Sequence, residues 1–457
     1  MKKKFKYLIK ILGVLVLTLV LINGCDLVDP THVRNPETTE ESLQKGSQGA
    51  TEPFVNGVKE AFANMMEDEA YFTDCVSDNY DNTSTYISPL VDSPTEIFPN
   101  DLTLNGADEG PYFETQQLRA LANFTLNTVI PNDPIATAEQ RAEVMFYRAM
   151  ANLVGAENFI AMPVVENGAA IAGADLLQAA ISDLNGSLEI SRHGDFEVRV
   201  NLALARTYRL AGNKASAVTA ANAALGGPPD FVFYAEYDAA NNENHAYHFS
   251  VSRNTNDMQP LPRLDFLDPK YIDRATPIPS LKMEEAHLIL AEAALSDGAY
   301  SSAVSHLVDA INLAKSRPTI TFVDADPRLD RPKGGTVQAS PTAPAISGLI
   351  FPRNGAEVNV PTITGTSLDA AAVASLTDPV EIFRTIYLAR QEMFFFEGRR
   401  MCDLGIRLPM MQRELETNHN IAAGSLGTAV LVPSYIPAGD TMDSFTITGD
   451  NTIITYV

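Results

Sequence analysis

The sequence predicts a mainly α-helical fold, in which helix-turn-helix units form a scaffold that carries large irregular insertions and a few short strands. The first observation is an internal repeat: residues 204–225 and 290–311 place small and apolar side chains at matching offsets. The second is that Gly212 and Gly298 hold the same position in the two copies, where a turn between helices favours glycine. This pattern is typical of tetratricopeptide helix pairs. Because long stretches without helical spacing separate the copies, we expect a scaffold with insertions and not a continuous solenoid.

The first residues of the chain have the pattern of an export signal. A cluster of lysines precedes an apolar stretch, 8–22, which is shorter than the roughly 20 residues that a membrane-spanning helix needs. The sequence Leu-Ile-Asn-Gly-Cys then ends at Cys25, as in a lipobox. We therefore predict a lipoprotein signal peptide over 1–24, lipid attachment at Cys25 and a lipidated tether over 25–37. An ordinary signal peptide with a chance cysteine is the alternative.

The remaining body, 38–457, is predicted to be a single acidic globular domain. The whole chain has 33 Lys and Arg against 57 Asp and Glu, so its net charge is −24. Such a surface repels nucleic acid and anionic lipid headgroups, so we expect no nucleic-acid partner and contact with the membrane through the lipid alone. Cys75 and Cys402 are far apart in the sequence, and buried thiols are favoured over a disulfide.

Helical spacing of apolar residues predicts further helices around the repeat. They cover 38–66, 112–126, 138–153 and 175–190. Three other segments lack a steady period and are rich in turn-forming or aromatic residues, which predicts loop-rich insertions with short strands. They cover about 71–111, 226–280 and 318–378. The last segment, 429–457, alternates in the manner of edge strands.

One block near the C-terminus has a distinctive order of charges: residues 385–408 read TIYLARQEMFFFEGRRMCDLGIRL. Its apolar spacing predicts a helix that ends at Gly398, because glycine readily adopts the left-handed conformation that closes helices. Arg399, Arg400 and Asp403 follow directly, where the last helical carbonyls need partners. We therefore expect ion pairs that pin a turn at this point.

This block, together with the rest of the chain, resembles the SusD/RagB family of outer-membrane lipoproteins. The likeness lies in the order of the parts: a lipobox, an early helix, a helix with Tyr147-Arg148-Ala149, tetratricopeptide hairpins and the closing motif. The residues that match the family are Cys25 as lipid site and Glu392, Glu397, Gly398, Arg399, Arg400 and Asp403 as fold motif. Two departures are the absence of tryptophan and the pair Met401-Cys402 where the family usually has an aromatic pair.

The resemblance implies a function as well as a fold. It implies about four tetratricopeptide helix pairs with a loop-rich face, on a lipoprotein that is anchored in the outer membrane and faces the cell exterior. It also implies a binding protein that is not an enzyme and needs no cofactor, whose nutrient is a glycan or oligosaccharide or, in some members, a peptide. The implied partner is a SusC-like TonB-dependent transporter, which receives the nutrient. The absence of tryptophan weighs against an extended polysaccharide ligand.

Two clusters of tyrosine and amide side chains fit a sugar ligand. A pyranose presents apolar C–H groups to an aromatic ring and bonds its hydroxyls to polar groups. The candidates are Tyr71, Tyr80, Tyr86 and Asn82 in the first cluster, and Tyr234, Tyr237 and Tyr247, near Asn241 and Asn242, in the second. The alternative is that these tyrosines only pack the loops onto the helices.

Known enzyme and metal motifs are missing from the sequence. It has no Gly-x-Ser-x-Gly, His-Glu-x-x-His, phosphate-loop or Cys-x-x-Cys motif. A paired-acid glycosidase stays open, because two carboxylates need no fixed spacing. His245 and His248 lack a third ligand, and Asp324, Asp326 and Asp330 lack the glycine and glutamate of a calcium loop, so no metal site is predicted. The alternative function is a tetratricopeptide assembly or scaffold lipoprotein of the cell envelope.

Overall fold

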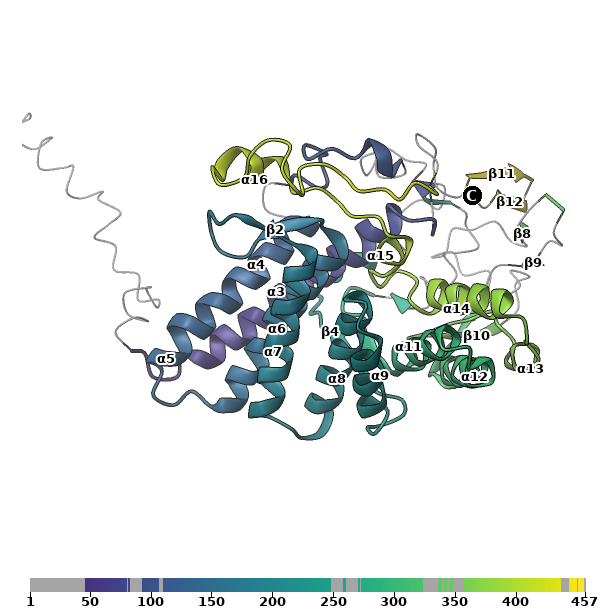
Figure 1. Ribbon diagram of the computed structural model, residues 1–457, viewed down its shortest axis with the longest axis horizontal. Coiled ribbons are helices and arrows are strands. Elements are labelled where there is room, and N and C mark those ends of the chain that lie inside the picture. Colours follow the sequence, from purple (N-terminus) through teal and green to yellow (C-terminus); the bar gives the residue numbers. More distant parts are fainter. Residues whose placement is uncertain are drawn as a thin grey trace, which may run out of the picture.

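The computed structural model describes residues 46–79, 81–82, 93–106, 110–247, 258–259, 270–271, 273–323, 336–338, 341–342, 346–347, 357–436, 444–449 and 451–455. Helices dominate this part of the chain and the strands are short, which confirms the mainly α-helical prediction (Figure 1). None of the helices described combines the length and the hydropathy that crossing a membrane requires. The predicted signal peptide, Cys25 and the tether lie outside the described residues.

Consecutive long helices pack against each other as pairs. The pairs are α3 (Thr51–Cys75) with α4 (Pro111–Phe124), α6 (Ala138–Asn158) with α7 (Gly173–Ile190), α8 (Gly194–Leu210) with α9 (Lys214–Ala224), and α11 (Met283–Ser296) with α12 (Tyr300–Ser316). Figure 1 shows them arranged one after another, from α4 and α3 through α8 and α9 to α12. Four helix pairs in the described residues agree with the number that the family resemblance implies.

The two copies of the internal repeat are the pairs α8/α9 and α11/α12, and their turns have the same geometry. Gly212 and Gly298 have φ of +69° and +73°, in the left-handed region that glycine tolerates best. After each glycine, the next N–H reaches back over the helix end: Asn213 donates to the Tyr208 carbonyl and Ala299 to the Ala294 carbonyl, both at 2.9 Å. This bond closes the helix and turns the chain into its partner.

Further helical segments, most of them short, extend the scaffold. They are the 3-10 helix η4 (Pro94–Glu96), the π-helical turn η5 (Thr125–Val129), α5 (Ile130–Asn132), α13 (Ala370–Ala374), α14 (Pro379–Met393), α15 (Arg400–Leu404) and α16 (Gln412–Thr417). Helix α14 packs on both α11 and α12, and so adds a third helix to the second copy of the repeat.

The strands form small sheets, most of them inside the insertions and the C-terminal segment, and β2 and β3 lie between α6 and α7. Antiparallel pairs join β1 (Asp81–Asn82) to β5 (Met258–Gln259), β2 (Ala161–Pro163) to β3 (Ala170–Ala172), β4 (Val232–Ala235) to β6 (Ile278–Lys282), and β7 (Thr319–Val323) to β10 (Glu357–Pro361). A four-stranded sheet has the order β11 (Ser444–Thr448), β12 (Asn451–Thr455), β8 (Thr336–Gln338), β9 (Ile346–Ser347), with β12 and β8 parallel. The C-terminal segment contains strands as predicted, but of the two only β11 lies at an edge of the sheet, because β12 pairs with both β11 and β8.

Two clusters of buried apolar residues hold the helices together. The larger one runs through α3 to α9 and the start of α11, and the smaller one joins α11, α12 and α14. Small side chains such as Ala291, Ala303 and Ala310 are completely buried in the smaller cluster, where they let the helices approach closely. Cys75 and Cys402 are both buried thiols, as predicted.

The first helix is shifted toward the C-terminus relative to its sequence pattern. It begins at Thr51, and residues 46–50 are not helical, so the predicted helix 38–66 is wrong over that part. The helix continues to Cys75, so Tyr71 belongs to it and the first insertion begins only after it. The side chains of the added turns are mostly buried, with polar residues such as Thr73 and Asp74 among them. Burial of polar residues is why the apolar period stopped marking the helix before its end.

The predicted helix end at Gly398 is wrong, because α14 ends at Met393. Phe396 and Gly398 have positive φ, +56° and +74°, which a continuous helix does not allow. Phe396 is held in this conformation by its surroundings: its N–H donates to the Asp74 carboxylate, and its carbonyl accepts from the Tyr271 hydroxyl at 2.8 Å. The tertiary structure therefore overrides the local helical pattern here.

Candidate functional site

An aromatic pocket lies between α3, α6, the start of α8 and the segment that follows α9. Its volume is about 860 Å³, within the range of small-ligand sites. Its aromatic lining consists of Phe62, Tyr147, Phe196, Phe231, Phe233, Tyr234 and Tyr237. Two predicted ligand residues, Tyr234 and Tyr237, therefore share one cavity with Asn241 and Asn242, which also line it.

The Arg199 guanidinium organises one wall of the aromatic pocket. It lies over the rings of Phe146, Phe196 and Phe233, at 4.6, 4.6 and 5.0 Å from their centroids. It also donates to the Glu143 carboxylate on α6, so its charge is paired. Cation–π contacts hold a ring face against the guanidinium. Arg199 therefore fixes two rings of the pocket lining, Phe196 and Phe233, in place before any ligand binds.

Strand β4 supplies the next part of the lining, through an irregularity in its pairing with β6. Successive strand residues normally point to opposite faces, yet Phe233 and Tyr234 both line the cavity. The register shifts between these two residues, as it does at a β-bulge, which re-aims a side chain. Tyr237 follows the strand, and its hydroxyl donates to the Ala63 carbonyl of α3 at 2.7 Å. Burial raises the pKa of that hydroxyl well above its usual value, so it stays a donor.

Acidic side chains dominate the charged part of the aromatic pocket. They are Glu60, Glu139, Glu143, Asp195, Glu236 and Asp238. The cationic side chains of the lining are Lys59 and Arg199, and Arg199 is already paired with Glu143. A ligand that carries negative charge would be repelled here, whereas hydroxyl groups would find many acceptors. The pocket is therefore suited to a neutral or cationic ligand.

The other predicted ligand residues do not line the aromatic pocket. Tyr71 is buried in α3 and packs edge-on against Phe396, with ring centroids 6.3 Å apart. Tyr247 is half-buried and lies beyond the pocket lining. Tyr80 and Tyr86 lie outside the described residues, and Asn82 is placed only as part of strand β1.

The two insertions that carry the predicted tyrosine clusters contact each other. The strands that join them, β1 and β5, are more than 150 residues apart in the sequence. Strand β1 pairs with β5, with Asn82 opposite Met258. A second link joins α3 to the later insertion, because the Glu67 carboxylate accepts from the His245 N–H at 2.9 Å. Glu67 lines a smaller acidic cavity of about 530 Å³ beside this link. Burial raises the pKa of Glu67 to about 9, so the residue is protonated at neutral pH.

A third cavity, of about 950 Å³, lies between α4, α6, α7 and α16. Its lining is rich in amide and charged side chains, including Asn123, Asn127 and Arg148, and Arg148 is paired with Asp183. No aromatic ring is among its described lining residues. Because a sugar ring needs an apolar face to stack on, the aromatic pocket is the better candidate for a glycan.

The closing motif is built around the Glu397 carboxylate, which is almost fully buried. One of its oxygens accepts from Lys270 at 2.5 Å and from Lys282 at 2.7 Å. The three side chains are between 1 and 2% exposed, so this charge cluster is shut off from water. Gly398 follows with a φ of +74°, a backbone conformation in which any other residue would be strained. The motif thus depends on the exact residue types that it contains.

The remaining charged residues of the motif join distant parts of the chain. Arg400 forms a two-pronged pair with Asp78, at the start of the first insertion, and Arg399 donates to the Ser280 carbonyl of β6. Asp403 accepts from Arg390 at 2.7 Å and from Arg209 of α8 at 3.1 Å. Burial acts to raise the pKa of the Asp403 carboxyl, but the two arginines hold it well below its usual value.

Glu392 anchors the segment before α13 to α14. Its carboxylate accepts from the Thr366 hydroxyl at 2.7 Å and from the Ser367 N–H at 2.8 Å. The ion pairs predicted for the motif are therefore present, and they join helices, insertions and strands and not only the local turn.

Sequence reasoning did not single out Arg199 or Phe196 as pocket residues. Their spacing on α8 is three residues, which places them on one helix face, but nothing local shows that Phe233 lies opposite. The described residues contain one group of histidine and acidic side chains with the spacing of metal ligands, and it lies between α11 and α12 and not in the aromatic pocket.

Comparison with known proteins gives structural matches but no sequence match: no family model fits the chain, and no curated protein matches it. Among solved structures, B. fragilis NanU aligns with a TM-score of 0.54 at 9% identity, over 81% of this chain and 91% of that one. A SusD superfamily protein from Bacteroides fragilis gives 0.52 at 14% identity, over 85% and 94%. A SusD-like carbohydrate binding protein from Bacteroides vulgatus gives 0.51 at 13% identity, over 79% and 83%.

These alignments cover most of each chain, so the protein has the SusD-type fold. The resemblance to the SusD/RagB family is thus confirmed at the level of the fold.

Proposed function

We propose that the protein is a SusD-type lipoprotein that binds a neutral oligosaccharide in the aromatic pocket and delivers it to a SusC-like TonB-dependent transporter. The observation that supports this best is the pocket itself, which combines aromatic faces with carboxylate and amide acceptors on a SusD-type fold. Sugars are bound in proteins by this combination, because each ring has an apolar face and a polar rim. The protein binds its ligand and does not convert it.

Charge narrows the ligand class. The acidic lining of the aromatic pocket repels carboxylated or phosphorylated sugars, and the whole chain carries a net charge of −24. A peptide ligand would need positive charge to suit the same lining. We therefore place neutral oligosaccharides first, and a cationic peptide is the competing ligand class.

The first test is binding of neutral oligosaccharides to a Tyr234→Ala variant. Tyr234 is half-buried in the pocket lining, so its ring offers a face for stacking, and removing it should cost about 1.4 kcal/mol, or roughly tenfold in Kd. The purified chain is screened on an array of neutral, sialylated and sulfated glycans and of lysine-rich peptides. Calorimetry then measures Kd for the best neutral oligosaccharide with wild type and variant.

Tyr300→Ala is the matched control, because Tyr300 is an exposed tyrosine at the start of α12, away from the pocket lining. We expect its Kd to equal that of wild type. Equal affinity of Tyr234→Ala and wild type would remove this pocket from the proposal. If the protein bound lysine-rich peptides and no neutral glycan, the ligand would be a cationic peptide and not an oligosaccharide.

Anchoring is tested at Cys25. Wild type should incorporate labelled palmitate and be recovered in the outer-membrane fraction together with a TonB-dependent transporter, because the acyl chains supply the membrane affinity. The Cys25→Ala variant should incorporate no palmitate and should be missing from the outer-membrane fraction. Cys402→Ala, which changes a buried thiol, should behave as wild type does. The proposed lipid anchor would be contradicted if Cys25→Ala still incorporated palmitate, or if the wild-type protein were found in the cytosol. Capture with periplasmic assembly proteins in place of a transporter would favour the scaffold alternative.

A further inference from the structure

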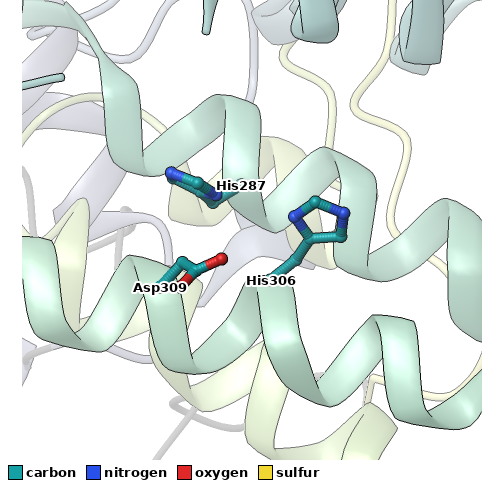
Figure 2. Close-up of side chains that lie close together, drawn as sticks. All are labelled: His287, His306 and Asp309. Carbon is teal, nitrogen blue, oxygen red and sulfur yellow. The ribbon is translucent and has the colours of Figure 1, made fainter.

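Three side chains that can bind a metal face one gap between α11 and α12. His287 belongs to α11, and His306 and Asp309 belong to α12. Figure 2 shows a ring nitrogen of each histidine and the carboxylate of Asp309 directed at this gap. One ligand atom from each residue lies within 4.8 Å of the other two.

The helix pair itself creates this grouping. His306 and Asp309 are three residues apart, so they lie on the same face of α12. The turn at Gly298 folds α12 back on α11 and brings His287 opposite them. The two imidazole rings are 5.9 Å apart between centroids, at an interplanar angle of 41°. The rings are therefore tilted against each other and not stacked.

Two atoms in the gap lack the partners that buried polar atoms normally have. The Nδ1 atoms of His287 and His306 are both buried, and neither has a hydrogen-bond partner among the described residues. Leaving a polar atom buried without a partner costs about 1–3 kcal/mol. Two such nitrogens side by side are an expensive arrangement for a purely structural helix pair. A ligand that accepts both lone pairs would remove this cost.

The chemistry of the donors identifies the class of ligand. An unprotonated imidazole keeps a lone pair on one ring nitrogen, and this lone pair can bind a metal. Two imidazoles and one carboxylate suit a divalent transition metal, and zinc above all, because zinc accepts nitrogen and oxygen ligands in tetrahedral geometry. Asp309 is exposed, so water can supply the fourth ligand.

We propose that His287, His306 and Asp309 form a zinc site that cross-links α11 and α12. In a tetrahedral site with ligands at 2.0–2.2 Å, neighbouring ligand atoms are about 3.3–3.6 Å apart. Small side-chain rotations close the spacing of 4.8 Å to that value. The site is independent of the aromatic pocket, since none of its residues lines that cavity. Its role is to stabilise the second copy of the helical repeat.

The test is calorimetric titration of EDTA-treated protein with zinc chloride at pH 7.5. We expect one zinc per chain, and a Tm that rises with zinc concentration, because zinc binds the folded state preferentially. His287→Gln, His306→Gln and Asp309→Asn should each weaken zinc binding by at least about tenfold, since even the loss of outer-shell partners costs 10–100-fold. His419→Gln, at an exposed histidine outside the group, should bind as wild type does.

Cobalt supplies a readout that needs no substitution. Cobalt(II) added to the metal-free wild type should give the visible absorption of a tetrahedral site, and zinc should displace it. The proposal is overturned if wild type binds no zinc, or if His287→Gln and His306→Gln bind it as tightly as His419→Gln does. An octahedral cobalt spectrum would also overturn it. Should a variant fail to fold, the wild-type stoichiometry and cobalt spectrum decide alone.

Discussion

The Glu397→Gln substitution is expected to lower the free energy of unfolding by about 3–5 kcal/mol, which is the usual cost of removing one partner of a buried ion pair. Among the described residues, Glu397 is the one carboxylate that both Lys270 and Lys282 contact, and all three side chains are almost fully buried. Glutamine keeps the size of the side chain and removes its charge. Two buried ammonium groups would then have mainly backbone carbonyls as acceptors, those of Phe395 and Met393.

The pH dependence gives this result a second signature. Burial already lowers the pKa of Lys282 to about 8, although Glu397 opposes the shift. Between pH 8 and the unfolded value near 10.5, the unfolded chain therefore binds more protons, and this group makes stability rise with pH. Without Glu397 the pKa of Lys282 falls further. The difference between variant and wild type should therefore narrow as the pH is raised from 7 to 10.

Urea unfolding at both pH values measures these differences. Glu381→Gln is the matched control, because Glu381 is also on α14 but forms an exposed pair with Arg384. Glu381→Gln should lower the free energy of unfolding by less than about 0.5 kcal/mol. If Glu397→Gln came within 1 kcal/mol of this control at pH 7, the buried cluster would not be the structural centre of the motif.

The Arg206→Met substitution should also lower the free energy of unfolding by about 3–5 kcal/mol. Here the substitution removes the cation of a buried ion pair, whereas Glu397→Gln removes the anion. Arg206 of α8 holds the Glu157 carboxylate of α6 through its Nε and Nη2, and the side chains are 2 and 3% exposed. Methionine fills most of the space and leaves a buried carboxylate without its cation. The free energy of unfolding is again read from urea denaturation.

Adding Glu157→Leu to this variant should recover at least half of the lost stability. Replacing both members of a buried pair with apolar residues is often nearly neutral, and Arg206 Nη1 already lacks a hydrogen-bond partner among the described residues. Lys214→Met, at the exposed pair with Asp297, is the control and should cost less than about 1 kcal/mol. A double variant less stable than Arg206→Met would show that the pair contributes net stability beyond charge compensation.

The helical scaffold was predictable because its information is local. Apolar spacing marked the helix pairs, and Gly212 and Gly298 marked their turns, where a positive φ is required whatever the surroundings. The prediction failed where distant groups hold the backbone. At Phe396, the Asp74 carboxylate and the Tyr271 hydroxyl stabilise a conformation that the local sequence does not encode.

The candidate site was predictable only in part. Aromatic and amide residues cluster near Tyr234 and Tyr237, which predicts a sugar site there, and both line the aromatic pocket. The same pattern predicts a ligand role for Tyr71, which is instead buried against Phe396. Composition shows where tyrosines are frequent, but the packing of α3 decides which of them reach a cavity.

Read alone, the chain established its helical repeat, its acidic character and the residues of its closing motif, since composition and periodicity are properties of neighbouring residues. Folding decided which side chains meet: Arg199 with Phe233 across the pocket, Glu397 with Lys270, and His287 with His306. These meetings depend on contacts between residues far apart in the chain. No spacing rule encodes such contacts, because they arise only when whole helices and insertions pack together.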